Sequence, residues 1–267
     1  MENIEYIFLI VGAGGTGGNF AKEFARFMAG FCEPGKSLKA ILIDGDKVED
    51  KNLSRQPFIG EDVQQFKAVA LGTAIQETFE LSEFYCCPKY IDSSRDLREL
   101  VRRFSTYGEF SYDGNITIPV IIGCVDNHRA RQCMHEFFMS CNTAFYFDSA
   151  NEFSVGEVVL GARMEGQLIA PDRTYYYPDV LTDDSPSAAE LSCGAVNISS
   201  PQHLATNLMA ANLLLSAVVN VVSENTFHGG IVYFDRCQMF SRFLSYADVA
   251  KEGGTSSCKK AGTESSN

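Results

Sequence analysis

The sequence predicts an α/β protein with a doubly wound, Rossmann-like and mainly parallel sheet that continues into an antiparallel C-terminal extension. An apolar strand pattern leads into a glycine-rich turn and an amphipathic helix at the N-terminus. Strand and helix patterns then alternate as far as about residue 150, which favours parallel strands joined by crossover helices. Two closing strands follow a long helix pattern. We expect one domain over residues 1–250, with halves at 1–150 and 151–250, and a disordered tail at 251–267.

The composition restricts the classes of partner. The 267 residues carry a formal net charge of -12, so a nucleic acid or an anionic membrane would meet mostly repulsion. No run of eighteen apolar residues suggests a membrane span. The nine cysteines, together with the lack of a signal-peptide pattern in residues 1–20, predict a reducing cytoplasmic location. Because no CxxC pair occurs, we expect no structural zinc.

The first element is a strand over residues 7–11, whose unbroken apolar run suits a parallel strand covered on both faces. The turn after it lets a phosphate approach the backbone because it is rich in residues without side chains: Gly12, Gly14, Gly15, Gly17 and Gly18. The following helix separates phenylalanines from charged residues on two faces. Its free N–H groups would point at the turn, so nucleotide binding is the leading hypothesis and a surface turn the alternative.

A second apolar strand over residues 39–43 ends at Asp44. In a dinucleotide-binding fold an acidic residue at this place holds the ribose, since a carboxylate accepts hydrogen bonds from both hydroxyl groups. A solvated turn residue is the alternative. Asp44 follows Gly17 by 27 residues (44 − 17), which is more than the ~20 that are usual in dehydrogenases.

The polar connection over residues 45–67 is the most informative stretch. Its candidate binding residues are Asp46, Asn52, Arg55, Gln56 and Lys67. An arginine binds phosphate through two parallel hydrogen bonds and a lysine acts as a point charge, so Arg55 and Lys67 beside a glycine turn suit a triphosphate. For each residue taken alone, an exposed charge on a solvated loop is the alternative.

A carboxylate follows the next central strand. The pattern first predicts a helix at 62–79, a strand at 84–91, a polar helix at 94–104 and a loop at 105–115. A buried strand at 118–125 then leads into Asp126 and Asn127. Because open α/β sheets bind ligands at the carboxyl ends of their strands, Asp126 is well placed to coordinate Mg²⁺ on the phosphates. Capping the helix that starts at His128 is a second, compatible role for it.

The C-terminal half contains one long apolar helix. The predicted elements are strands at 145–148 and 157–163, a mobile crossing segment at 175–191, a helix at 200–223, and strands at 230–234 and 239–244. Ser200 and Pro201 suit the N-cap and first position of the helix. Its polar residues form one narrow stripe, made of Asn212, Ser216, Asn220 and Ser223. Such a helix belongs in a core or a subunit interface.

These pieces together resemble the ThiF, MoeB and HesA family of ATP-dependent activators, which includes the adenylation domain of ubiquitin-activating enzymes. The similar stretches are GAGGTGG, LIDGDKVEDKNLSRQ, FKAVA, CVDNHRAR and SCGAV, and they extend over most of residues 5–245. NLSRQ and DNHRAR together are specific, whereas the glycines alone are not. Within the family, the sequence looks most like the shorter variant from plasmid-associated gene clusters, the PRTRC-system ThiF proteins.

The resemblance implies an adenylyltransferase that works as a homodimer on a ubiquitin-like or sulfur-carrier protein. In the family, the partner's C-terminal carboxylate, usually after Gly-Gly, attacks the α-phosphate of ATP and expels pyrophosphate. Residues 1–150 would bind the nucleotide and residues 151–250 the partner or second subunit. Asp44 would hold the ribose and Asp126 the magnesium. The phosphates would contact Asn52, Arg55, Gln56 and Lys67, with Asp46, Asn127 and the glycines completing the site.

Cys193 lies near the position at which some family members carry an acyl or persulfide-linked intermediate. A thiolate there would attack the acyl-adenylate if its pKa were lowered. No His or Lys adjoins it in the sequence, and a small structural cysteine is the alternative.

Two departures from the family keep other functions open. Tyrosines in RTYYYPDV stand where bacterial relatives have a zinc-binding CxxC pair, and the first strand starts without the arm whose arginine reaches the partner subunit's ATP. A nicotinamide-dependent oxidoreductase would explain the glycines and Asp44, but not Arg55, Lys67 and Asp126 together. A nucleotide-binding scaffold that has lost catalysis would explain the departures.

Overall fold

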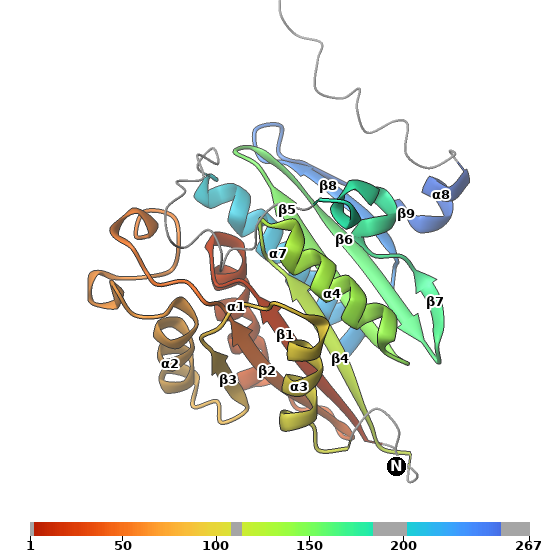
Figure 1. The fold of residues 1–267 in the computed structure, drawn as a ribbon, viewed down its shortest axis with the longest axis horizontal. Helices are drawn as coiled ribbons and strands as arrows, with labels where there is room; N and C mark the ends of the chain where they lie inside the picture. Colours follow the sequence, from red (N-terminus) through yellow and green to blue (C-terminus); the bar gives the residue numbers. More distant parts are fainter. Residues whose placement is uncertain (1–2, 108–113, 184–201, 252–267) are drawn as a thin grey trace, which may run out of the picture.

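The computed structural model describes residues 3–107, 114–183 and 202–251. Within these ranges, one mixed sheet of nine strands runs through both halves of the chain in the order β3-β2-β1-β4-β5-β6-β8-β9, with β7 paired to β6. Helices cover both faces of the sheet (Figure 1). The predicted doubly wound, mainly parallel α/β fold with an antiparallel C-terminal extension is confirmed.

Five parallel strands form the first part of the sheet: β1 (Ile4–Val11), β2 (Lys36–Ile43), β3 (Phe84–Cys87), β4 (Ile116–Gly123) and β5 (Ala144–Asn151). Val11 at the end of β1 pairs with Ile43 of β2 and with Gly123 of β4. The carboxyl ends of these three strands are therefore level, so the segments that follow them lie along one edge of the sheet.

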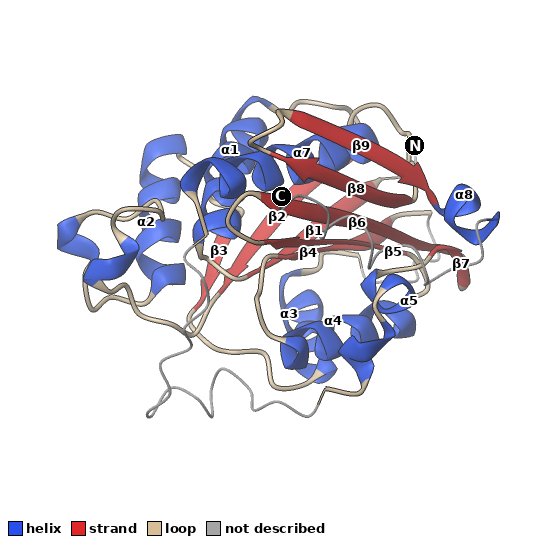
Figure 2. Ribbon diagram, turned by 90° about the horizontal axis from the view of Figure 1, so that it is seen from above, coloured by secondary structure: helices blue, strands red, loops and turns tan. Residues whose placement is uncertain are grey.

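Helices on the two faces enclose two apolar clusters. α1 (Gly15–Gly30), α2 (Lys67–Phe79) and α7 (Leu204–Val222) lie on one face, and α3 (Ser94–Phe104) and α4 (His128–Ser140) on the other (Figure 2). Phe8 and Phe24 belong to the first cluster, and Leu9 and Phe137 to the second. Neighbouring residues of β1 thus point to opposite faces, as the strand period requires.

Antiparallel strands extend the sheet beyond β5: β6 (Val155–Met164), β7 (Gln167–Ala170), β8 (Gly230–Asp235) and β9 (Phe240–Ser245), with α8 (Tyr246–Lys251) after them. Val155 at the start of β6 pairs with Asp235 at the end of β8. Because β6 reverses the direction of β5, these ends return to the edge at which the parallel strands finish.

Several predicted boundaries were wrong for local reasons. The helix expected from residue 62 begins at Lys67, because Gly60–Asp62 forms a separate 3₁₀ turn, η2. The strand expected to reach residue 91 stops at Cys87, and Pro88 follows, which has no N–H for the ladder. The strand expected at 118–125 occupies Ile116–Gly123. β7, a short and largely exposed strand, was not predicted.

The start of the long helix also differs from the prediction. α7 begins at Leu204 because the ring of His203 accepts the N–H of Ala205, whereas Ser200 and Pro201 lie outside the described residues. In the segment expected to be a mobile crossing, the chain forms α5 (Arg173–Tyr176) and a 3₁₀ turn, η3 (Pro178–Leu181); residues 184–191 are outside the described part. Of the expected tail, only Lys251 is described, as the last residue of α8.

α7 is the one helix of the described residues that is long and apolar enough to cross a membrane by length and composition. Half of it is buried within the fold, where it packs against α1, β5 and β6. A core position explains this apolar composition. The absence of a membrane span stays a prediction. The exposed side of α7 includes Asn212, Ser216 and Asn220, three of the four residues of the polar stripe seen in the sequence. The fourth, Ser223, is half-buried and is the C-cap of the helix.

Candidate functional site

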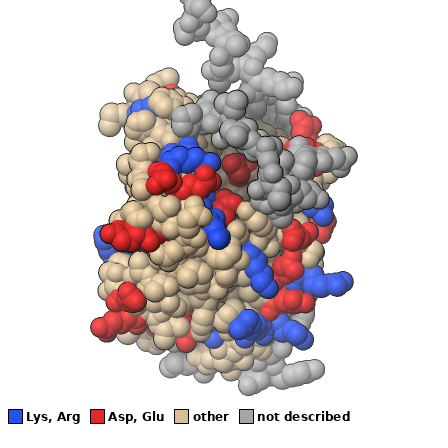
Figure 3. Space-filling model, turned by 60° about the vertical axis from the view of Figure 1, so that its left-hand side comes forward, with Lys and Arg blue, Asp and Glu red and all other residues tan. Residues whose placement is uncertain are grey.

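A cleft of about 1620 Å³ runs along the edge of the sheet at which the parallel strands end. The glycine turn after β1 and the segments after β2, β3, β4 and β5 line one part of it, and β6, β8 and β9 line another. Residues of α1, α4 and α7 also contribute to its walls. Acidic and basic side chains are interspersed on the surface shown in Figure 3. Open α/β sheets bind ligands at the carboxyl ends of their strands, so this cleft is the candidate site.

The structure brings most of the predicted site residues to this cleft. Those that line it are Gly12, Gly14, Gly15, Asp44, Asp46, Arg55, Gln56, Lys67, Asp126 and Asn127. Gly17 and Asn52 are not among its lining residues. Cys193 lies outside the described part of the chain. Three stretches that are far apart in the sequence therefore meet at one edge of the sheet.

The glycines of the turn have different structural roles. Gly12 has a φ of +96°, and a Cβ there would lie 2.5 Å from the carbonyl oxygen of Cys124. A Cβ on Gly17 would lie 1.9 Å from the carbonyl oxygen of Gly12. Gly14, the N-cap of α1, faces open space, with its nearest neighbour Gln56 at 4.0 Å. Gly12 and Gly17 thus allow close packing, while Gly14 leaves the N-terminus of α1 open to the cleft.

Asp44 links the glycine turn to the loop after β2. Its Oδ2 accepts the N–H of Ala13 at 2.6 Å, and its Oδ1 accepts the N–H of Asp46 at 2.7 Å. Burial raises the pKa of Asp44, against the lowering effect of the Lys67 ammonium group. Each carboxylate oxygen keeps a second lone pair that could accept a further hydrogen bond.

Lys67 is the first residue of α2 and is only 8% exposed. Its Nζ lies 2.9 Å from Oδ2 of Asp46, and the hydroxyl of Tyr90 donates to the other carboxylate oxygen at 2.5 Å. Burial opposes ionisation of Asp46, but Lys67 and Tyr90 outweigh it and lower the pKa of Asp46. Lys67 and Asp46 therefore form an ion pair at the cleft, and Tyr90 is a lining residue that sequence reasoning missed.

The loop after η1 (Asp50–Asn52) carries Arg55 and Gln56 into the cleft. Asn52 is buried; its Oδ1 accepts the N–H of Glu49, and its carbonyl oxygen accepts the N–H groups of Arg55 and Gln56. The guanidinium of Arg55 has no ion-pair partner in the described part of the chain, and Oε1 of Gln56 is buried there without a hydrogen bond. Asn52 thus organises the loop, while Arg55 and Gln56 keep polar atoms for a ligand.

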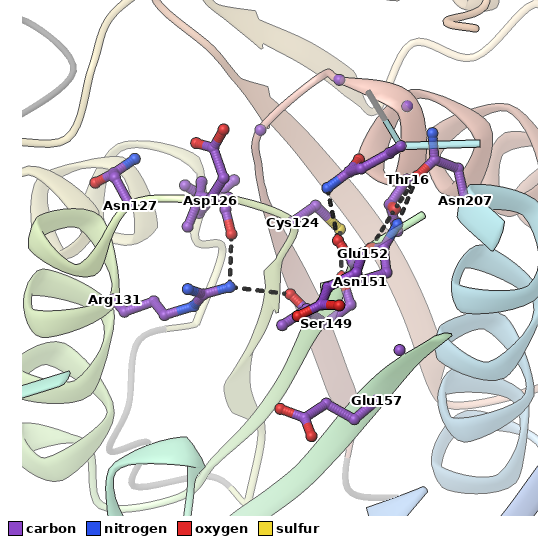
Figure 4. Close-up of a pocket in the computed structure, with 18 of the residues that line it drawn as sticks. Thr16, Cys124, Asp126, Asn127, Arg131, Ser149, Asn151, Glu152, Glu157 and Asn207 are labelled. Carbon is purple, nitrogen blue, oxygen red and sulfur yellow. Dashed lines mark hydrogen bonds between the residues drawn. The ribbon is translucent and has the colours of Figure 1, made fainter. Parts of the chain in front are cut away.

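Beside α4, the capping role belongs to Asn127 instead of Asp126. Oδ1 of Asn127 accepts the N–H of Ala130 at 2.8 Å, which makes Asn127 the N-cap. Figure 4 shows Asp126, Asn127 and Arg131 together on the α4 side of the pocket. Asp126 is exposed, and its carboxylate has no partner among the described residues. The prediction that Asp126 caps α4 was therefore wrong by one residue. Because Asn127 caps the helix, the carboxylate of Asp126 is available to a ligand.

A buried ion-pair network supports the backbone under Asp126. Arg131 donates to the carbonyl oxygen of Val125 at 2.7 Å, and its Nε lies 3.2 Å from Oδ2 of Asp148. Arg173 pairs with the same Asp148 oxygen and with Glu157, a cleft residue. Two arginines and two carboxylates balance in charge, which lets them be buried together. Sequence reasoning missed this network, although Arg131 stands within the DNHRAR stretch.

A third polar group joins α1, β5 and α7. Oγ1 of Thr16 lies 3.1 Å from Oδ1 of Asn151, and the amide of Asn151 donates to Oδ1 of Asn207 at 2.6 Å. Figure 4 shows these three side chains pointing toward one another across the pocket from Asp126. A Cβ on Gly15 would lie 2.0 Å from the amide nitrogen of Asn207, so a larger residue there would displace the Asn207 side chain.

The donor set fits a metal ion that arrives with a ligand. In the described ranges, no three His, Cys, Asp or Glu residues are grouped so that they could hold a metal ion. Mg²⁺ on a nucleotide uses one or two protein carboxylates together with phosphate oxygens and water. The carboxylate of Asp126, which lines the cleft and has no partner among the described residues, meets that requirement.

The sequence profile of the ThiF family matches residues 5–256. No curated protein matches the sequence significantly. Among solved structures, PaaA has a TM-score of 0.60 at 18% identity, over 91% of this chain and 64% of its own. Escherichia coli MccB with ATP has a TM-score of 0.59 at 15% identity, over 97% of this chain and 66% of its own. MccB with selenomethionine MccA has a TM-score of 0.60 at 14% identity, over 95% and 65%.

At these identities the similarity shows the fold. This chain spans about two thirds of the length of each of these structures.

Proposed function

The chain belongs to the ThiF family, and on that premise we propose that it is an adenylating enzyme that uses ATP to activate the C-terminal carboxylate of a small protein. The family resemblance read from the sequence motifs is thereby confirmed, while the PRTRC subfamily stays a prediction. The observation that supports the activity best is that the glycine turn, Arg55, Lys67 and Asp126 line one cleft. MccB, which shares the fold, has been solved with ATP and with MccA.

The proposed reaction is an in-line displacement at phosphorus. A carboxylate oxygen of the partner bonds to the α-phosphorus, the bond from that phosphorus to the bridging oxygen breaks, and pyrophosphate leaves with the electron pair. The products are an acyl-adenylate and pyrophosphate. The partner's carboxylate is already ionised at neutral pH, so no general base is required. Catalysis then consists of aligning the two reactants and stabilising the charge that grows on the pyrophosphate.

We assign the nucleotide contacts by chemistry. Arg55 and Lys67 are the cations for the phosphates, and the open N-terminus of α1 is a further anion site. Asp44 has lone pairs left for the ribose hydroxyls. Asp126 would hold Mg²⁺, which neutralises phosphate charge when it is bound.

We place the partner's C-terminal tail in the remaining part of the cleft. That part is lined by aromatic residues of the β5–β6 connection, β8 and β9, among them Phe153, Tyr233 and Phe240. A narrow, unbranched tail such as Gly-Gly would bring its carboxylate past these rings to the phosphates. We accordingly propose a ubiquitin-like or sulfur-carrier protein as the partner. We also propose a cytoplasmic location and a homodimer that uses the uncharged exposed stripe of α7.

The test is exchange of labelled pyrophosphate into ATP. We expect exchange only when a candidate partner with a free C-terminal Gly-Gly is present, and none when that C-terminus is amidated. If ATP binds but no candidate supports exchange, the scaffold function is favoured. The oxidoreductase alternative does not account for Arg55, Lys67 and Asp126 at one cleft.

Cys193 remains the proposed acceptor of the activated acyl group. Its thiolate would attack the acyl-adenylate carbonyl and expel AMP, giving a thioester. Mass spectrometry of the protein incubated with ATP and partner would reveal an acyl adduct on Cys193. An adenylate without any adduct on the enzyme would remove Cys193 from the mechanism.

A further inference from the structure

Four hydrogen bonds hold Asp46 in place. Its N–H donates to Oδ1 of Asp44 at 2.7 Å, and its carbonyl oxygen accepts the N–H of Lys67 at 2.9 Å. One carboxylate oxygen accepts a hydrogen bond from Nζ of Lys67 at 2.9 Å, and the other accepts one from the hydroxyl of Tyr90 at 2.5 Å. One residue therefore joins the end of β2, the start of α2 and the segment after β3.

The ring of Tyr90 packs against Gly45. A Cβ on Gly45 would lie 2.6, 2.7 and 2.8 Å from three atoms of the Tyr90 ring. The ring thus lies flat against the backbone between Asp44 and Asp46, in a space that any larger residue at position 45 would fill. The absence of a side chain on Gly45 and the hydroxyl of Tyr90 together determine where the Asp46 carboxylate lies.

The orientation of Lys67 depends on that carboxylate. A lysine ammonium group has three donors, and one of them goes to Asp46. The other two are available to the cleft that Lys67 lines. A carboxylate held at only one oxygen can rotate, and the ammonium group that it binds would then move with it. Supporting residues of this kind keep binding groups in the productive geometry.

We propose that Tyr90 is a positioning residue for the nucleotide site: it holds Asp46, and Asp46 aims the ammonium group of Lys67 at the phosphates. Tyr90 acts through Asp46 and Lys67 and does not itself contact the phosphates. This assignment rests on the proposed function, because it makes ATP the ligand.

The first experiment measures ATP·Mg binding by calorimetry. Tyr90→Phe removes one hydroxyl group and keeps the ring on Gly45, so we expect binding about tenfold weaker, the size of one hydrogen bond to a charged group. The matched control is Tyr85→Phe, because Tyr85 donates to Glu83 at 2.9 Å and is not a cleft residue. The control is expected to bind ATP as the unchanged protein does.

A double-mutant cycle separates positioning from direct contact. In a Lys67→Met background, Tyr90→Phe should weaken ATP binding by less than about twofold, since the group that it positions is gone. An equal loss in both backgrounds would overturn the proposal, as would unchanged binding by Tyr90→Phe alone. Gly45→Ala, which displaces the ring, should weaken binding and add little to Tyr90→Phe.

A second readout does not depend on ATP. Acetylation of Lys67 by acetic anhydride, followed by mass spectrometry of the nucleotide-free protein, should be several times faster in Tyr90→Phe and unchanged in Tyr85→Phe. If the unchanged protein fails to bind ATP, the proposed function is wrong. The rate of Lys67 acetylation would still show whether Tyr90 restrains Lys67. Equal acetylation rates in the two variants would overturn the proposal.

Discussion

At the scale of single residues, two kinds of polar side chain lie in the cleft or in the loops beside it. Asn52, Asn127 and Arg131 direct their polar atoms to backbone groups and thereby hold the loops. Arg55 and Asp126 have no ion-pair partner in the described ranges of the chain. Unpartnered charges beside an open cleft are the groups that a ligand can use, and removing them should change binding more than stability.

Asp126→Ala should therefore abolish pyrophosphate exchange and leave the melting temperature within about 2 °C, because surface substitutions usually change stability by under about 0.5 kcal/mol. Asp50→Ala is the control, since Asp50 is an exposed residue of η1 outside the cleft. Normal exchange by Asp126→Ala would show that the metal assignment is wrong.

Substitutions of two glycines in the turn should affect protein stability and ATP binding separately. Gly17→Ala brings a methyl group to 1.9 Å from a backbone oxygen, so we expect a loss of about 1–3 kcal/mol in the free energy of unfolding. Gly14→Ala has room, and should leave urea unfolding nearly unchanged while weakening ATP binding at the N-terminus of α1. If Gly14→Ala binds ATP normally, the phosphates do not approach this residue.

At the scale of elements, a buried carboxylate joins the strands at the edge opposite the cleft. Glu5 of β1 is 1% exposed, pairs with Lys39 of β2 at 2.9 Å, and accepts hydrogen bonds from Thr106 and Thr117. Burial acts to raise the pKa of Glu5, but the hydrogen bonds from Thr106, Lys39 and Thr117 outweigh it. The folded-state pKa of Glu5 is therefore below its ordinary value of 4.5.

A lowered carboxyl pKa contributes stability above the unfolded-state value, and that stability is lost as the pH falls through the folded-state value. Glu5→Gln should cost about 2 kcal/mol in urea unfolding at pH 7. The difference from the unchanged protein should shrink below about pH 4.5. Glu83→Gln is the control, because Glu83 is a more distant and half-exposed partner of Lys39, at 3.9 Å. A loss for Glu5→Gln that is constant with pH would contradict the ionic role.

α7 is the second element with a testable surface. One side packs in the core, and the exposed side carries Asn212, Ser216 and Asn220 without any charged residue between them. If this side is the dimer interface, Ser216→Arg places two like charges near a twofold axis and should reduce dimer affinity at least about tenfold. Light scattering would give the mass, with Thr78→Arg on the exposed side of α2 as control. A dimer that survives Ser216→Arg would exclude this interface.

At the scale of the whole molecule, the cleft spans the parallel sheet and its antiparallel extension. Residues after β1, β2, β4 and β5 meet residues of β8 and β9 in one continuous space. A ligand that bridges these parts would stabilise the fold as a whole, because it binds only when all of them are in place.

ATP·Mg at 100 times its Kd should add about 2.7 kcal/mol of stability, which corresponds to a rise of about 5–10 °C in melting temperature for a chain of this size. NAD at the same concentration should give no comparable rise, because it has no terminal phosphate for Arg55 and Lys67. Stabilisation by NAD alone would contradict the adenylating function and favour the oxidoreductase.

Sequence reasoning reached the arrangement of the cleft because periodicity and chain order are properties of the sequence. Apolar runs identified the strands, and parallel strands end at one edge, so Asp44 and Asp126 could be expected near the glycine turn. The strand register confirms this geometry, since Val11, Ile43 and Gly123 are level. The roles of these residues toward a nucleotide stay predictions.

The α/β order, the glycine turn and the strand-end residues could thus be predicted, because all of them follow from local pattern in the sequence. The tertiary structure decided which side chains meet: Tyr90 on Asp46, 44 positions away, and Arg131 and Arg173 on one Asp148 oxygen. It also decided that Asn127, and not Asp126, caps α4. Such contacts depend on packing between distant segments and on single-residue register, neither of which leaves a periodic signal in the chain.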